Sequence, residues 1–167
     1  MEISGAEYLN TLSTLSITFV GFSALLIFFR QIAGGGMSKY DSYFVLTFMQ
    51  TGFIVTIGSI IPYILHSFGL EEAMVWRIAS AIMVIPLLVF VITLPRRRRS
   101  VTGASMPVAI RIPLLLQWFA ALLLIQNAAA IPFAPAFSFY GAALVLVLIT
   151  AMVAFLFALG IIFRESK

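Results

Sequence analysis

The chain has 167 residues, of which 62% are hydrophobic and only 10% are charged, whereas ordinary soluble domains contain about 25% charged residues. This composition excludes a soluble protein and predicts one membrane domain over residues 1–167, with little chain left for a soluble catalytic or sensory domain. The net charge of +4 does not favour nucleic-acid binding, because the basic residues lie beside apolar segments, where anionic lipid is the nearer partner.

Residue usage also argues against catalysis. The sequence has no cysteine and one histidine, His66, which excludes disulfides, thiolate nucleophiles and a pair of histidine haem ligands within one chain. It contains no phosphate-binding glycine loop and no nucleophile paired with a base. We therefore expect no cofactor, no metal, no catalytic residue and no enzymatic activity.

Five segments are apolar and long enough to cross a hydrocarbon core, which takes about 20 helical residues. They lie near residues 7–29, 42–65, 73–94, 110–131 and 139–163. The breaks between them are marked by Gly34-Gly35-Gly36, by Ser67-Phe68-Gly69, by Pro95, and by Pro132 with Pro135. The predicted fold is an all-α integral membrane protein with five transmembrane helices. Residues 132–138 are uncharged and form either an outer loop or a re-entrant segment.

The run Arg96-Arg97-Arg98-Arg99 orients this protein in a membrane. Short loops rich in lysine and arginine stay cytoplasmic, and alternation of five spans then places the N-terminus outside and the C-terminus inside. With this orientation nine basic residues lie inside and only Arg77 lies near the outer side. We expect the bacterial inner (plasma) membrane, with the run contacting anionic inner-leaflet lipids. A solvated topological anchor is the simpler interpretation of the same arginines.

The sequence contains a weak internal repeat at the two predicted outer turns. Ile61-Pro62 before Ser67-Phe68-Gly69 resembles Ile131-Pro132 before Ser138-Phe139-Tyr140-Gly141. The spacing is compatible with one helix followed by two helical hairpins. Outer turns that simply favour proline, serine and glycine would give the same pattern.

The first span is the most polar of the five. At 100° per residue a narrow stripe gathers Glu7, Thr11, Thr14, Thr18 and Gly21, while Ser13, Ser16 and Ser23 fall on the opposite side. Lipid offers hydroxyl groups no partner, so this stripe indicates either close helix packing or the lining of a narrow pathway with Glu7 as an outer acidic ring. Alternatively, Ser4 and Glu7 form a capping box.

Further polar residues lie in the second and fourth spans. Gln50, Thr51, Gln117, Gln126 and Asn127 are expected to hydrogen-bond between helices, with a polar cavity as the functional alternative. No ionisable side chain lies near the centre of a predicted span, which disfavours proton-driven transport.

Two functions fit these observations. The first is a homo-oligomer with the opening helix near its axis, forming a passive, channel-like conduit for an ion or small solute. The second is a non-transporting accessory or assembly subunit of a larger membrane complex, whose first helix packs against a foreign helix.

Overall fold

The computed structural model describes residues 3–32, 39–102 and 108–164, and within these ranges every regular element is a helix. The helices are α1 (Ala6–Ile32), α2 (Lys39–Ser67), α3 (Glu72–Thr102), α4 (Val108–Ala129) and α5 (Phe137–Arg164). Each of the five is long and apolar enough to cross a membrane. The predicted all-α bundle of five such helices is therefore confirmed. The turn expected at Gly34–Gly36 lies outside the described residues.

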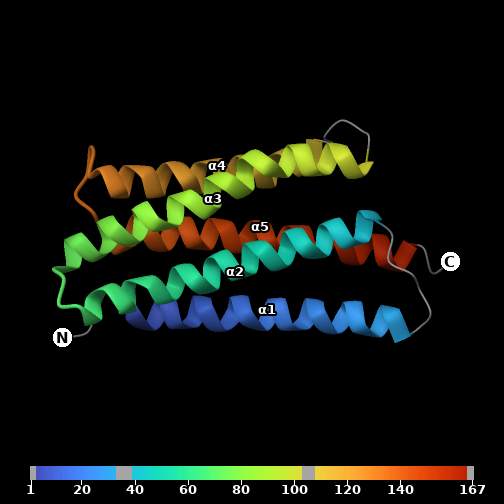
Figure 1. Ribbon diagram of the computed structural model, residues 1–167, viewed down its shortest axis with the longest axis horizontal. Coiled ribbons are helices and arrows are strands. Elements are labelled where there is room, and N and C mark those ends of the chain that lie inside the picture. Colours follow the sequence, from blue (N-terminus) through green and yellow to red (C-terminus); the bar gives the residue numbers. More distant parts are fainter. Residues whose placement is uncertain (1–2, 33–38, 103–107, 165–167) are drawn as a thin grey trace.

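The helices stack in three layers (Figure 1). α4 lies in one outer layer, α2 and α5 in the middle layer and α1 in the opposite outer layer, while α3 crosses from the level of α2 and α5 at its start to lie beside α4 at its C-terminal end. Helices α2, α3, α4 and α5 make a closed ring in which each contacts the next, whereas α1 lies outside this ring and packs mainly on α2. The architecture is thus one helix added to two antiparallel hairpins, α2–α3 and α4–α5.

A short link joins the two helices of each hairpin, and both links lie at the bundle end where α1 begins (Figure 1). The α2–α3 link turns at Gly69, which has a φ of 76° that favours glycine. The α4–α5 link begins at Ala130, with a φ of 59°, and includes a cis peptide bond before Pro132. Residues 130–136 contain no helix of their own, so the link between α4 and α5 is an irregular segment.

Helix α3 differs from the sequence prediction at its C-terminal end. Pro95 was expected to end the helix, but α3 continues through the arginine run to Thr102. An interior proline removes one backbone hydrogen bond, yet arginine is a good helix former, and the Ser100 hydroxyl donates to the Arg97 carbonyl oxygen at 2.6 Å. The four arginines therefore point in different directions around a helix instead of lying together in a loop.

Large side chains fill the centre of the four-helix ring. Trp76 and Tyr140 are fully buried with ring centroids 5.6 Å apart, and the Tyr140 hydroxyl donates to the Gly58 carbonyl oxygen at 2.6 Å. Outside the ring, isoleucine, leucine and phenylalanine side chains are exposed on all five helices. An apolar surface of this extent would be unfavourable in water. Together with the five long apolar helices, it indicates an integral membrane protein.

Candidate functional site

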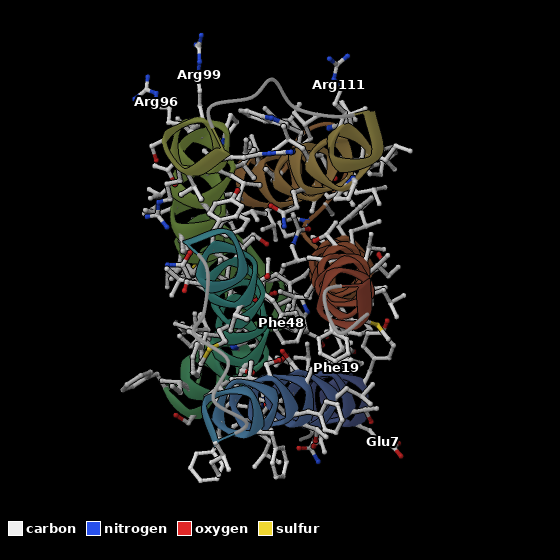
Figure 2. All side chains as sticks on the ribbon, turned by 90° about the vertical axis from the view of Figure 1, so that its right-hand side faces the viewer. Glu7, Phe19, Phe48, Arg96, Arg99 and Arg111 are labelled. Atoms are coloured by element: carbon white, nitrogen blue, oxygen red, sulfur yellow. The ribbon has the colours of Figure 1, made fainter. Side chains whose placement is uncertain are left out.

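The inner side of α1 is fixed by close contact with α2. Ser16 is buried, and its hydroxyl donates to the Gly52 carbonyl oxygen at 2.7 Å. Gly52 has no side chain, so Val20 of α1 can pack directly over it. The rings of Phe19, Phe48 and Phe155 then close the junction of α1, α2 and α5, as Figure 2 shows for the first two.

The outer side of α1 carries the polar stripe that the sequence analysis singled out. Its five members, Glu7, Thr11, Thr14, Thr18 and Gly21, are all exposed, and a Cβ added at Gly21 would meet nothing within 4 Å. Glu7 projects away from the other helices (Figure 2). The stripe is therefore turned away from the rest of its own chain. Ser16 and Ser23, on the opposite side, are buried.

The threonine hydroxyls of this stripe hydrogen-bond within α1. Thr11 donates to the carbonyl oxygen of Glu7 at 3.0 Å, Thr14 to that of Asn10 at 2.9 Å and Thr18 to that of Thr14 at 2.7 Å. These bonds use the hydroxyl hydrogens and leave oxygen lone pairs that can still accept. The surface of the stripe thus offers weak acceptors and methyl groups.

Sequence reasoning missed how the stripe continues. Asn10 is exposed beside Thr11 and Thr14, and the same 100° arithmetic places it at the edge of the stripe. Towards the other end of α1 the stripe becomes apolar, with Leu25, Phe28 and Phe29 exposed. One half of this face is therefore polar and the other half is hydrophobic.

A second polar group lies inside the four-helix ring. The buried Gln117 amide donates to the Thr150 hydroxyl at 2.9 Å, which links α4 to α5. Its amide oxygen is buried and accepts no hydrogen bond from the described residues. Beside it lies a cavity of about 50 Å³ whose lining includes Thr51 and Arg98. A cavity needs about 10–15 Å³ of such space to hold one water molecule, so this cavity is large enough to hold water.

Asn127 holds three parts of the chain together. Its amide nitrogen donates to the Ser80 hydroxyl at 2.8 Å, and its amide oxygen accepts from the Ala136 backbone N–H at 2.8 Å. These bonds join α4 to α3 and to the link before α5. For the neighbouring Gln126, the amide nitrogen is buried without a partner among the described residues. Asn127 therefore links α4 to α3 and to the segment before α5 by hydrogen bonds of its buried side chain.

The arginine run divides among different environments. Arg98 is only 4% exposed, while Arg97 donates to the Gln50 amide oxygen of α2 at 3.0 Å. Arg96 and Arg99 are exposed and project, with Arg111 of α4, to the side of the molecule opposite α1 (Figure 2). The run is thus not a uniform patch.

At the opposite end of the bundle, the residues before α1 lie against α3. The Ser4 side chain hydrogen-bonds to the Glu72 carboxylate, which also accepts from the Trp76 indole N–H at 3.2 Å. Gly5 has a φ of 75° and lies so close to Phe137 that a Cβ would be 2.4 Å from its ring. Ser4 therefore ties the start of α1 to α3.

Comparison with known proteins adds no relative. The chain matches no protein-family model, no curated protein and no solved structure.

Proposed function

We propose that this protein assembles in the bacterial inner (plasma) membrane as a homo-oligomer and forms a passive conduit for an ion or small solute. In this proposal α1 lies near the symmetry axis, with the N-terminus outside and the C-terminus in the cytoplasm. The observation that supports it is the outward direction of the polar stripe on α1. A stripe of this kind facing lipid would gain nothing from its hydroxyls.

The route we propose runs between copies of the chain. Side chains such as Trp76, Tyr140 and Leu124 fill the interior of the four-helix ring apart from the cavity of about 50 Å³ beside Gln117, whereas the outer face of α1 is open. Symmetry-related copies of α1 would bring their stripes together around one axis. The threonine oxygens would then accept hydrogen bonds from water in the conduit, and Glu7 would form an acidic ring at its outer mouth.

The apolar half of the same face suits a gate. Leu25, Phe28 and Phe29 continue the line of the threonines towards the cytoplasmic end of α1. Rings of such side chains can close a pore by excluding water, without any charge. The conduit would therefore be hydrated at the Glu7 end and closed at the Phe29 end.

The test combines oligomeric state with conductance. Purified full-length protein in detergent should give one defined homo-oligomer by light scattering, and should conduct in planar bilayers. Glu7→Gln should lower the preference for cations over anions, because it removes the acidic ring. Glu71→Gln is the matched control, since Glu71 is exposed at the same end of the bundle but does not belong to α1. A monodisperse monomer that gives no conductance would contradict the proposal.

A specific observation favours a second function. Three threonine hydroxyls of the stripe already donate to their own backbone, so this face presents methyl groups and a glycine, as helix-packing surfaces do. An accessory or assembly subunit would use this face to bind a helix of another protein. Affinity isolation from native membranes should then recover one stoichiometric partner. Recovery of this chain alone would exclude the accessory function.

A further inference from the structure

An exposed apolar stripe on α3 leads directly to two arginines. Ile85, Val89 and Ile92 are exposed, and Arg96 and Arg99 follow at the same alternation of four and three residues. Residues at this spacing share one side of a helix. The side of α3 that faces away from the bundle is thus hydrophobic along two or more turns and ends in two guanidinium groups.

Helix α4 repeats this arrangement beside it. Leu122, Phe119 and Leu115 are exposed in succession, and the exposed Arg111 follows four residues further towards the start of the helix. α3 and α4 contact each other and run antiparallel, so the arginines of both stripes lie at the same end of the bundle. Figure 2 shows Arg96, Arg99 and Arg111 projecting to the same side.

The length of α3 places these arginines at the level of lipid head groups. Arg96 is 24 residues beyond the start of α3 at Glu72, a rise of about 36 Å at about 1.5 Å per residue. The hydrocarbon core is about 30 Å thick, and the head groups add several ångströms on each side. When α3 begins at one edge of that core, side chains that project sideways 36 Å further along the helix meet lipid phosphates.

The other arginines of the run do not share this face. Arg97 donates to Gln50 of α2, and Arg98 is buried inside the bundle. The continuation of α3 through Pro95 therefore selects Arg96 and Arg99 from the run, and the packing of α4 adds Arg111.

We propose that the outer face of the α3–α4 pair is a binding site for an anionic phospholipid. The phosphate lies against Arg96, Arg99 and Arg111, and the acyl chains lie along the stripes of Ile85, Val89 and Ile92 and of Leu115, Phe119 and Leu122. A lipid fits better than an acidic protein segment, because the arginines are continuous with two apolar stripes that a polar segment could not cover. The site requires insertion in a membrane, but it does not depend on the conduit, which concerns the opposite layer.

The test measures lipid binding to the delipidated full-length protein by native mass spectrometry. Phosphatidylglycerol and phosphatidylcholine with identical acyl chains are added separately, and phosphatidylglycerol should bind the more tightly. Arg96→Gln/Arg99→Gln should weaken phosphatidylglycerol binding by about fivefold for each arginine, the factor expected from about 1 kcal/mol per basic residue near an anionic surface. Arg111→Gln, on a different helix, should weaken it by about fivefold alone.

Two controls make the proposal falsifiable. Arg77→Gln/Arg97→Gln removes the same charge from outside this face and should leave the preference for phosphatidylglycerol in place. An equal loss in this control would show that net charge, and not a site, attracts the lipid. Soluble glycerol 3-phosphate should not displace the lipid at equal concentration, and displacement by it would exclude the contribution of the acyl chains. If Arg96→Gln/Arg99→Gln and Arg111→Gln both bind phosphatidylglycerol unchanged, the proposal is overturned.

Discussion

The hydroxyl of Ser16 on α1 donates to the carbonyl oxygen of Gly52 on α2 at 2.7 Å, and both residues are buried. This contact brings the two helices close together at one point and fixes the rotation of α1 about its own axis. Because Ser16 faces α2, the threonines on the other side of α1 face away from the bundle. The direction of the proposed conduit face therefore depends on this contact.

Replacing Gly52 by alanine should disrupt the packing of α1 on α2. The new Cβ would lie 2.4 Å from Cγ2 of Val20, a β-branched side chain with little rotational freedom. We expect a loss of about 1–3 kcal/mol, typical of overpacking, measured as a lower temperature of unfolding in detergent. Gly21→Ala is the control, because its Cβ would meet nothing within 4 Å. Equal destabilisation by both changes would contradict the close contact at Gly52.

Replacing Gly5 by alanine should be more damaging than the same change at Gly69. Both glycines have a positive φ, 75° and 76°, so both variants should lose about 1 kcal/mol from backbone strain. Only Gly5 adds a steric clash, with the Phe137 ring, which Tyr8 and Trp76 hold in place by edge and tilted contacts. The temperature of unfolding in detergent should be lower for Gly5→Ala than for Gly69→Ala. The reverse order would show that the segment before α1 does not pack on α5 as described.

Replacement by leucine should destabilise the protein at Asn127 but not at Gln126. Asn127→Leu removes the partners of the Ser80 hydroxyl and of the Ala136 N–H, and each buried polar group left unpaired costs about 1–3 kcal/mol. Gln126→Leu removes an amide nitrogen that is buried without a partner among the described residues, so it should be neutral or stabilising. Thermal unfolding in detergent compares the two variants. An equal drop in the temperature of unfolding for both variants would show that the hydrogen bonds of Asn127 have no specific role in joining the helices.

The gate proposed on α1 predicts that Leu25→Thr increases conductance severalfold. A threonine at position 25 would extend the polar stripe into the apolar half of the same face and ease its wetting. Planar bilayer recordings on the purified protein measure the change. Leu15→Thr is the control, since Leu15 is exposed on α1 beside the stripe and not within it. Identical recordings from wild type and Leu25→Thr would contradict a gate at this position.

Much of the fold follows from local properties of the chain. A helix is set by apolar segments of about 20 residues, and its ends are set by glycine and proline, as at Gly69 and Pro132. The separation of the threonines from the serines on the first helix is equally local, because it depends only on 100° per residue. The prediction that the third helix ends at Pro95 was wrong. Proline usually ends a helix, but the arginines that follow it continue α3 to Thr102.

The sequence by itself determined the number of helices, their approximate ends except the C-terminal end of α3, and the two polar sides of α1. Only the tertiary structure decided which of those sides faces inward, because serine and threonine are alike in polarity and the choice depends on Gly52, 36 positions away from Ser16. It likewise decided that Arg98 is buried while Arg96 and Arg99 are exposed. Four identical neighbouring arginines differ in exposure only because the helix distributes them around its axis and other helices pack against one side of it.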